Sequence, residues 1–552
     1  MGAISFIQIL LCELKIFYKK IDIICRKCYY SYISVLLRIV QIKDEGIKMK
    51  NILEYLELSA LQYPDKIAAR DPQEMDTYAE LRDNARKTGS YFLSRESTRR
   101  PIAVFMEKSV RVLELFMGIV YSGNFYVLID PSFPVERINR ILEVLNPLCV
   151  VTIQDNVSKL QETEYKGEIV IEDEAYEDID EQGLAAVREG MMETDPLYGI
   201  FTSGSTGVPK CVLVGHSSVI DFINVFTETF NITDSDVIGN QAPFDFDVSV
   251  KDIYSCLKTG ATLVIIPKSY FMFPTAVMDW LYENKVTTLI WAVSALCLLN
   301  RLHGLKYKQL DDLNKVLFSG EAMPLKQLRQ WREYYPNAMF VNLYGPTEIT
   351  CNCTYEIIDR EYEDDDKLPI GRTFDNEKVF LLSDNDELIT DVDSTGEICV
   401  AGRCLALGYY NNEDANAKAF TPNPTNKLYY ERIYRTGDLG YYGADGKLYF
   451  AGRKDFQIKH MGHRIELEEI DSAVNKVDGI ERSLCFFDDV KNKIVCIYEG
   501  SLEPKDLKDA LKTTIPDWMV PNVMLPIDEM PLNKNGKTDR TVLKEYYRER
   551  KG

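Results

Sequence analysis

Short runs of β-branched and other apolar residues alternate with helical patterns along the chain from Met49 onward. Two of the strand-like runs are Ile102-Ala-Val-Phe105 and Cys149-Val-Val-Thr-Ile153, and residues Glu136 to Leu145 have the spacing of a helix. Strands that alternate with helices in this way build layered α/β folds with substantially parallel sheets. The sequence therefore predicts an α/β protein, and 552 residues allow about three or four lobes.

A domain boundary is predicted near Gly452-Arg453-Lys454-Asp455. After this segment a new strand and helix begin, between Phe456 and Val474, and start a separate alternation. We therefore expect a large, multi-lobed N-terminal domain with mixed or parallel sheets over residues 49–453. A small α+β domain is expected over residues 454–552, a length within the ordinary range of a domain.

The first 48 residues differ from the rest of the chain and are rich in Ile, Leu, Tyr and Lys. Their apolar stretch, Ile4 to Cys12, is shorter than the ~20 residues that cross a bilayer, and no small-residue cleavage site follows it. Met49 opens a conventional amphipathic segment, Asn51-Ile-Leu-Glu-Tyr-Leu-Glu-Leu58. We interpret residues 1–48 as a wrongly assigned start or a disordered extension. The alternative is a membrane-surface or partner helix, and no stable membrane insertion is expected.

Charge and cysteine usage exclude several classes of protein. A formal net charge of −21 repels phosphate backbones, so a general nucleic-acid binder is not expected. The 13 cysteines show no framework spacing and lie mostly in apolar runs, which is typical of reduced core cysteines in a cytoplasmic protein. Cys25-x-x-Cys28 has the spacing of a metal or redox pair, but no second pair or histidine accompanies it, so we expect no metal site there.

A loop rich in glycine and hydroxyl residues lies between two strand-like runs, Leu197 to Phe201 and Cys211 to Val214. Glycine lets the backbone approach an anion closely, while hydroxyls and amides donate to phosphate oxygens and a lysine adds positive charge. The loop lacks the spacing of a Walker A motif, and no helix follows it directly. The sequence therefore predicts a phosphate-binding loop formed by Thr202, Ser203, Gly204, Ser205, Thr206, Gly207 and Lys210.

This loop resembles the signature of the adenylate-forming superfamily, which includes acyl-CoA synthetases, luciferases and nonribosomal-peptide adenylation domains. The resemblance covers essentially the whole chain after Met49, because further motifs occur in the order that the family has. These motifs are Thr77-Tyr-Ala-Glu-Leu81, Asn342-Leu-Tyr-Gly-Pro-Thr-Glu348, Gly396-Glu-Ile398 with Gly408-Tyr-Tyr410, Tyr434-Arg-Thr-Gly-Asp438, Gly452-Arg-Lys-Asp-Phe-Gln-Ile-Lys459 with Gly462-His-Arg-Ile-Glu-Leu-Glu-Glu469, and Asn535-Gly-Lys-Thr-Asp-Arg540.

The resemblance implies an ATP site that also holds Mg²⁺. It places the adenine ring against Tyr344, and the ribose hydroxyls against Asp438 with Arg453 in support. Glu348 would hold Mg²⁺, which prefers hard oxygen ligands. Thr347 would lie beside the α-phosphate.

The resemblance also implies two half-reactions that require different orientations of the C-terminal domain. In the first, a substrate carboxylate attacks the α-phosphorus of ATP, and Lys537 supplies the catalytic charge. The small domain then rotates about a hinge at Asp455, which brings Lys459 and Gly462 to the site. In the second, the acyl group passes to the phosphopantetheine thiol of a carrier protein. Since the chain ends soon after the last motif, we expect that carrier to be a separate protein.

The segment Gln241 to Tyr254 resembles the amino-acid-activating branch of the superfamily. Asp247 would pair with the α-ammonium of the substrate, because a buried cation requires such a partner. A purely structural alternative is that Asp247 caps a helix beginning at Val248. An acyl- or aryl-CoA ligase and a non-catalytic scaffold protein are the alternative functions.

The resemblance also implies a pocket for the substrate side chain, and Lys251 is its most informative residue. Four residues after Asp247, Lys251 would lie near the substrate side chain and favour a carboxylate or another acceptor. It could instead pair with Asp247 or extend its ammonium to solvent. The chain is also similar to D-alanine–carrier protein ligases, in which an apolar residue would suit this position better. The other predicted pocket residues are Leu317, Ser319, Leu343, Cys351 and Asn352.

Overall fold

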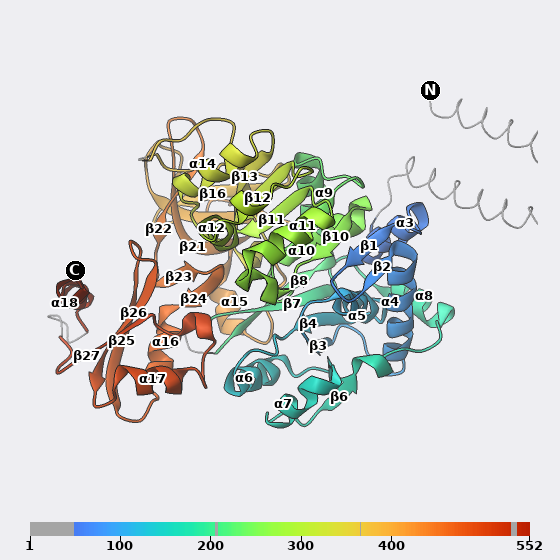
Figure 1. The fold of residues 1–552 in the computed structure, drawn as a ribbon, viewed down its shortest axis with the longest axis horizontal. Coiled ribbons are helices and arrows are strands. Elements are labelled where there is room, and N and C mark those ends of the chain that lie inside the picture. The colour runs from blue at the N-terminus through green and yellow to red at the C-terminus, as the bar shows by residue number, and fades with distance from the viewer. Residues whose placement is uncertain (1–48, 205–207, 365, 532–537, 552) are drawn as a thin grey trace, which may run out of the picture. The chain divides into compact units, whose positions relative to one another are not determined.

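The structure is a computed structural model that describes residues 49–204, 208–364, 366–531 and 538–551. From Lys50 onward these residues form one compact unit (Figure 1). The N-terminal part of this unit contains three sheets, and the C-terminal part contains two small ones. The predicted α/β class is confirmed, with mixed and parallel sheets in the large part and an α+β arrangement in the small part.

The nine-stranded sheet has a parallel centre and antiparallel edges. Its six central strands pair in parallel, whereas β2, β14 and β15 pair antiparallel. Parallel neighbours need long crossover connections, which the alternating helices provide. Across the sheet the strands are β15 (Arg372–Thr373), β14 (Thr354–Ile357), β13 (Met339–Tyr344), β12 (Lys315–Ser319), β11 (Thr288–Ala292), β9 (Val237–Asn240), β10 (Thr262–Ile265), β1 (Ile67–Arg70) and β2 (Met75–Thr77).

The seven-stranded sheet is also largely parallel. Its order is β19 (Gly408–Tyr409), β8 (Lys210–Gly215), β7 (Pro196–Thr202), β4 (Phe125–Leu128), β3 (Pro101–Phe105), β5 (Cys149–Thr152) and β6 (Glu168–Ile171). At one end, β8 pairs antiparallel with both of its neighbours, β7 and β19. The third N-terminal sheet is antiparallel, with β17 (Leu388–Ile389), β16 (Glu377–Leu382), β18 (Gly396–Gly402), β21 (Arg432–Tyr442), β20 (Phe420–Pro422) and β22 (Leu448–Arg453).

The C-terminal part contains a two-stranded hairpin and a three-stranded sheet. The hairpin pairs β23 (Gln457–His460) with β24 (His463–Glu466), and the sheet consists of β25 (Ile480–Asp488), β26 (Lys493–Gly500) and β27 (Val523–Ile527). Its helices are α16 (Leu467–Val474), α17 (Pro504–Leu511) and α18 (Arg540–Lys551). A hydrophobic cluster that includes Ile470, Cys496 and Leu507 is built from this part alone, which supports our proposal of a boundary between residues 453 and 454.

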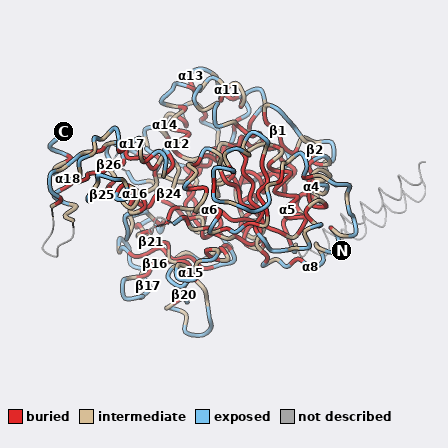
Figure 2. The backbone as a smooth tube through the Cα atoms, turned by 90° about the horizontal axis from the view of Figure 1, so that it is seen from below, coloured by how far each residue is buried: buried red, intermediate tan, exposed pale blue. Residues whose placement is uncertain are grey.

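Helices cover the sheets of the N-terminal part, and the most buried of them is α5. In Figure 2 this helix lies within the buried region, and Arg111 is its one residue that is not buried. The helices of the N-terminal part are α3 (Leu53–Gln62), α4 (Tyr78–Leu93), α5 (Val110–Tyr121), α6 (Val135–Leu145), α7 (Val157–Gln161), α8 (Glu181–Gly190), α9 (His216–Thr229), α10 (Val248–Thr259), α11 (Pro274–Glu283), α12 (Val293–Arg301), α13 (Gly304–Tyr307), α14 (Leu325–Tyr334) and α15 (Glu413–Ala419).

The motif Thr77-Tyr-Ala-Glu-Leu81 has a local structural explanation. The Thr77 side chain accepts from the backbone N–H of Glu80, and the Glu80 carboxylate accepts from the Thr77 N–H, which forms a capping box at the start of α4. This reciprocal pair satisfies two N–H groups that lack partners within the helix. The motif therefore positions a helix on the nine-stranded sheet and lies outside the site described below.

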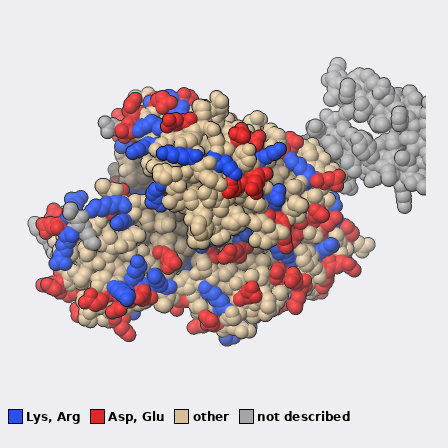
Figure 3. Space-filling view, viewed as in Figure 1, with Lys and Arg blue, Asp and Glu red and all other residues tan. Residues whose placement is uncertain are grey.

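The described ranges of the chain bear on the expectations for membrane spans, metal ligands and surface charge. No helix there is long and apolar enough to cross a bilayer, and no group of three or more potential ligands could hold a metal ion. The Cys25–Cys28 pair lies outside the described residues. Acidic and basic side chains are interspersed among the described residues on the face shown in Figure 3. The described cysteines are all unbridged, and nearly all are buried.

Candidate active site

The glycine-rich loop connects β7 to β8, so the two strands hold its ends together. Thr202 and Lys210 are cross-strand partners. Ser203 and Gly204 are both buried, and Ser205, Thr206 and Gly207 lie outside the described residues. The structure therefore places the two ends of the predicted loop side by side at one edge of the seven-stranded sheet.

Two donors at the start of this loop, from Ser203 and Gly204, are bound by the C-terminal part. The Ser203 hydroxyl donates to the backbone carbonyl of Arg464 at 2.7 Å and accepts from the N–H of Glu466 at 3.2 Å. The N–H of Gly204 donates to a carboxylate oxygen of Glu469 at 3.3 Å. A side-chain hydroxyl and a backbone amide that suit phosphate oxygens are thus engaged by the protein itself.

Asp438 joins the end of β13 to the β21–β22 pair. Its Oδ2 accepts from the Tyr344 hydroxyl at 2.6 Å, and its other oxygen forms an ion pair with Arg453. Asp438 and Arg453 are cross-strand partners, so strand register alone brings them together. Arg453 also donates through Nε and Nη2 to the two oxygens of Asp455, at 2.6 and 2.8 Å. The predicted ribose, adenine and hinge residues therefore form one connected cluster.

Glu348 lies in a short 3₁₀ turn, Thr347–Ile349, that follows β13. Only 1% of the residue is exposed. Its two carboxylate oxygens lie 2.8 and 2.7 Å from Nη1 of Arg464, and the Tyr409 hydroxyl donates to it at 2.7 Å. Burial alone would raise the pKa of Glu348, but the Arg464 charge and the hydrogen bonds to the carboxylate, Tyr409 among them, together hold the pKa below its ordinary value. The carboxylate is therefore ionised, and a guanidinium balances its charge.

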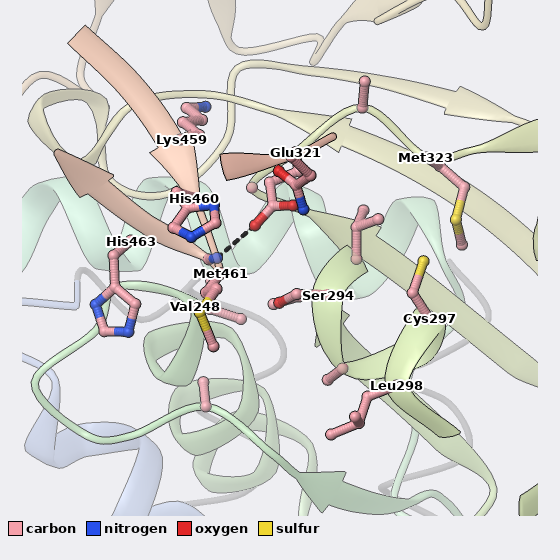
Figure 4. Close-up of a pocket in the computed structure, with 18 of the residues that line it drawn as sticks. Val248, Ser294, Cys297, Leu298, Glu321, Met323, Lys459, His460, Met461 and His463 are labelled. Atoms are coloured by element: carbon pink, nitrogen blue, oxygen red, sulfur yellow. Dashed lines mark hydrogen bonds between the residues drawn. The ribbon is translucent and has the colours of Figure 1, made fainter. Parts of the chain in front are cut away.

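The β23–β24 hairpin carries the predicted residues Lys459 and Gly462 to this region. Its turn consists of Met461 and Gly462, with φ of 54° and 83°, a combination typical of two-residue hairpins. The N–H of Gly462 donates to Oε1 of Glu321, drawn as a dashed line in Figure 4. The ammonium of Lys459 lies 5.5 Å from the ring centroid of Tyr344.

A cavity of about 2080 Å³ lies beside the hairpin. Its lining comes from both parts of the chain and includes Tyr344, Asp438 and Lys459. Figure 4 shows Ser294, Cys297 and Met323 of the N-terminal part in the same pocket as the hairpin turn. The cavity is thus continuous with the residues that the sequence assigns to nucleotide binding and to the second half-reaction.

Asp247 occupies the position directly before α10, yet its side chain makes no capping hydrogen bond. The purely structural alternative, a helix cap, is therefore wrong. Burial raises the pKa of the Asp247 carboxyl, although the Lys251 charge and the Thr347 hydroxyl partly offset the shift. No residue in the described ranges forms an ion pair with this carboxylate within 4 Å.

Lys251 is buried, with 1% of the residue exposed. Its ammonium donates to Oδ1 of Asn352 at 2.7 Å and to the Ser319 hydroxyl at 3.3 Å. Extension to solvent and direct pairing with Asp247 were the two alternatives, and the structure contradicts both, because the side chain points into the protein toward β12 and the β13–β14 connection. Burial lowers the pKa of Lys251.

The remaining pocket residues are only partly brought together. Cys351 donates through its thiol to the backbone carbonyl of Asp247 at 3.0 Å, and Leu317 is buried within β12. Leu343 lines the large cavity, together with Phe246 and Val248 on either side of Asp247. Asp247, Lys251, Leu317, Ser319, Cys351 and Asn352 do not belong to that lining. Lys537 lies outside the described residues.

Four residues with direct contacts in this region had no role assigned from the sequence. They are Glu321, Tyr409, Arg464 and Glu469. Three of them lie inside motifs that are visible in the sequence, Gly408-Tyr-Tyr410 and the run from Gly462 to Glu469. Glu321 follows the end of β12, and the carboxyl edge of a parallel sheet is where ligand sites usually lie. These two signals could have identified all four.

Comparison with known proteins gives one family and one fold. The family model described as AMP-binding enzyme matches residues 56–410. Tyrocidine synthase 1 of Brevibacillus parabrevis is 31% identical over 503 residues, which cover 90% of this chain and 45% of that protein. The chain therefore spans less than half the length of this curated relative.

Two solved structures share the fold. The adenylation domain AlmE of Vibrio cholerae, in complex with glycyl-adenosine-5′-phosphate, has a TM-score of 0.78 at 21% identity and covers 91% of this chain and 99% of its own. Holo-PA1221, an NRPS protein containing adenylation and PCP domains bound to a vinylsulfonamide inhibitor, has a TM-score of 0.76 at 22% identity, with coverages of 90% and 84%.

Proposed function

This chain belongs to the AMP-binding enzyme family, and on that premise we propose that it activates an amino acid as an aminoacyl-adenylate. The substrate carboxylate attacks the α-phosphorus of ATP, a phosphorus–oxygen bond forms, and pyrophosphate leaves. The acyl group then passes to the phosphopantetheine thiol of a separate carrier protein, with release of AMP. The enzyme is thus an acid–thiol ligase whose first product is a mixed anhydride.

The nucleotide site follows from the cluster around Asp438. A carboxylate accepts hydrogen bonds from both hydroxyls of a ribose, and Arg453 holds this one in place. The Tyr344 ring lines the cavity beside it and offers a face to adenine. Thr347 and the glycine-rich loop supply donors for the phosphates. We assign the catalytic positive charge of the first half-reaction to Lys537.

Glu348 fits a magnesium ion, because it is a buried and ionised carboxylate that already balances a cation in this structure. Hard oxygen ligands of this kind suit Mg²⁺, which is usually shared with phosphate oxygens. When bound, the ion would neutralise charge that develops on the phosphates. The role of the protein is to hold the Glu348 carboxylate in place, and the Tyr409 hydroxyl does so through a hydrogen bond of 2.7 Å.

The observation that carries the amino-acid assignment is the desolvated carboxylate of Asp247, which forms no ion pair with any of the described residues. Its pKa is raised because it is desolvated without a cation in direct contact. The α-ammonium of an amino acid would relieve that cost, since a buried charge is stable only when it is paired. A fatty or aryl acid has no such group, and for this reason we favour an amino acid over the substrate of an acyl- or aryl-CoA ligase.

Exchange of pyrophosphate into ATP, measured with amino acids of both hands and with their des-amino analogues, tests this function. Asp247→Asn is expected to lower kcat/KM for the preferred amino acid by about 10- to 150-fold, the effect of one charged hydrogen bond. The kcat/KM for the des-amino analogue should be the same in the variant as in the unaltered enzyme. Asp252→Asn on the same helix is the matched control. The Asn240 side-chain amide donates to the Asp252 carboxylate at 2.6 Å, so this carboxylate already has a partner within the protein.

If the des-amino acid is the better substrate of the unaltered enzyme, the amino-acid assignment is wrong. The proposed function is then that of an acyl- or aryl-CoA ligase. Transfer to a phosphopantetheinylated carrier, compared with transfer to free coenzyme A, identifies the acceptor. We propose a carrier protein as the acceptor, and the shared fold with PA1221, an NRPS protein that contains adenylation and PCP domains, supports a carrier over free coenzyme A.

Lys251 is proposed to select a substrate side chain with a carboxylate or an amide oxygen. Its ammonium has three N–H donors, of which Asn352 and Ser319 use two. Lys251→Met should therefore lower the pyrophosphate exchange rate with aspartate or glutamate by about 10- to 150-fold. The rate with alanine should be unchanged. If the unaltered enzyme prefers D-alanine and the variant keeps that ranking, the acidic substrate is wrong, and a D-alanine–carrier protein ligase is the function.

A further inference from the structure

Lys108 is a charged residue of the cavity lining that the proposed mechanism does not use. It lies in the connection between β3 and α5, and its ammonium is surrounded by four oxygens at the end of β9. The distances are 2.8 Å to Oδ1 of Asn240 and to the carbonyl of Gln241, and 3.1 Å to the carbonyls of Asn240 and Ala242. Because an ammonium has three N–H donors, these acceptors use its whole hydrogen-bonding capacity.

The carbonyls that Lys108 binds lie where the segment 240–242 leaves the nine-stranded sheet. β9 ends at Asn240, and Pro243 follows soon afterwards with no N–H to donate. Within the described ranges, the carbonyls of Gln241 and Ala242 accept from no other donor. Lys108 therefore supplies the hydrogen bonds that a neighbouring strand would otherwise give.

One turn connects this segment to Asp247. The N–H of Phe246 donates to the carbonyl of Pro243 at 3.2 Å, and α10 begins at Val248, directly after Asp247. A short connection held by a single turn transmits the position of the segment 240–242 to the Asp247 carboxylate.

Lys108 reaches this segment from the other large sheet. It follows β3 of the seven-stranded sheet and lies 132 residues from Asn240 in the sequence. Burial lowers the pKa of Lys108 to about 7, although the charges of Asp252 and Asp245 partly offset the shift. Apolar side chains could join two sheets without this cost of desolvation. The presence of a cation here therefore indicates a role beyond joining the sheets.

We propose that Lys108 is a positioning residue for the amino-acid substrate, because it fixes the segment 240–242 and thereby places the Asp247 carboxylate where the α-ammonium binds. This inference deepens the proposed function and rests on it. Since Lys108 acts on the binding of a group remote from the reacting carboxylate, it should affect the KM of an amino acid and leave kcat nearly unchanged. A lysine that only joined the two sheets would affect stability and every substrate alike.

Lys108→Met keeps the aliphatic stem and removes the ammonium. In pyrophosphate exchange we expect it to raise the KM of the preferred amino acid by about 10-fold, the effect of one hydrogen bond to a charged group, with kcat almost unchanged. The KM of the des-amino analogue should not change. Lys108→Arg, which retains the positive charge and N–H donors, should restore most of the affinity for the amino acid. Equal losses for both acids, or no loss for either, would overturn the inference.

A double-mutant cycle with Asp247→Asn tests whether the effect passes through Asp247. Once Asp247→Asn is present, Lys108→Met should change the KM of the amino acid by less than about twofold, because residues that act through one contact are not additive. A full effect of Lys108→Met in both backgrounds would show that the lysine acts by another route and would overturn the inference.

Lys66→Met is the matched control. The Lys66 ammonium also donates to a backbone carbonyl, that of Gly260 at 2.6 Å, and Lys66 does not line the cavity. Its replacement should lower the melting temperature and leave the KM of both acids unchanged, whereas a change like that of Lys108→Met would contradict the inference. If Lys108→Met does not fold, Lys108→Gln, which keeps two N–H donors, is measured in its stead against the same outcomes.

Failure of the proposed function is visible in the unaltered enzyme, and failure of this inference only in the variants. If the unaltered enzyme prefers the des-amino acid, the amino-acid assignment and this inference are both wrong. If it prefers the amino acid and Asp247→Asn removes that preference, but Lys108→Met leaves it intact, the inference alone is wrong.

Discussion

Replacing Lys537 with alanine is expected to lower the rate of adenylate formation by about 10²- to 10³-fold, the loss typical of one preorganised charge or donor at the reacting centre. The reason is that negative charge develops on the phosphate oxygens while pyrophosphate leaves. In the first half-reaction we assign no other residue of the C-terminal domain to that charge. Transfer of the acyl group from a supplied aminoacyl-adenylate to the carrier should be almost unchanged.

Two assays on the same protein distinguish this from general damage. Pyrophosphate exchange measures the first half-reaction, and carrier loading from synthetic aminoacyl-adenylate measures the second. Lys534→Ala removes a lysine that directly precedes the motif Asn535 to Arg540 and should leave both rates intact. A loss of equal size in both assays would contradict the assignment of Lys537 to one half-reaction.

Replacing Gly462 with valine is expected to have the opposite effect, with a loss of about 10²-fold in transfer to the carrier and little change in adenylation. Gly462 has a φ of 83°, which a β-branched residue adopts only with strain. A Cβ at this position would lie 3.5 Å from the Cβ of Ala292 and 3.7 Å from the Ser294 hydroxyl. The two further methyl groups of valine have to enter the remaining space, which displaces the hairpin from the cavity.

Gly446→Val separates this effect from backbone strain. Gly446 has a φ of 74° in the β21–β22 turn, and a Cβ there would meet nothing within 4 Å. Its replacement should lower the melting temperature by a similar amount and leave both half-reactions unchanged. If the Gly446 variant also loses transfer, strain rather than occupation of the cavity explains the result at Gly462.

The class of fold could be predicted from the sequence because it depends on local patterns. β-Branched runs that alternate with helical spacing require layered sheets and helices wherever they occur. The same locality holds for the glycine-rich loop, since Thr202 and Lys210 belong to consecutive strands that pair with each other. Likewise, Arg453 reaches Asp438 because their strands are neighbours in an antiparallel sheet.

Local patterns could not decide which partner a buried charge would have. Lys251 and Asp247 are one helical turn apart, and spacing left open whether they pair or whether Lys251 lies near the substrate side chain. The structure instead directs the lysine to Asn352, which is 101 residues away and comes close only when the nine-stranded sheet is assembled. The helix-cap alternative at Asp247 failed for a related reason, because the position of a residue before a helix does not determine the direction of its side chain.

The sequence by itself determined the α/β class and the order of motifs that belong to the AMP-binding family, because these depend on residue type and on spacing along the chain. Only the tertiary structure decided that Arg464 meets Glu348 across 116 residues and that Glu469 meets Gly204 across 265. Both contacts require the C-terminal part to lie against the region of the glycine-rich loop and Glu348. The relative placement of two separately packed parts depends on the surfaces they present to each other, and that information is absent from the local pattern of either one.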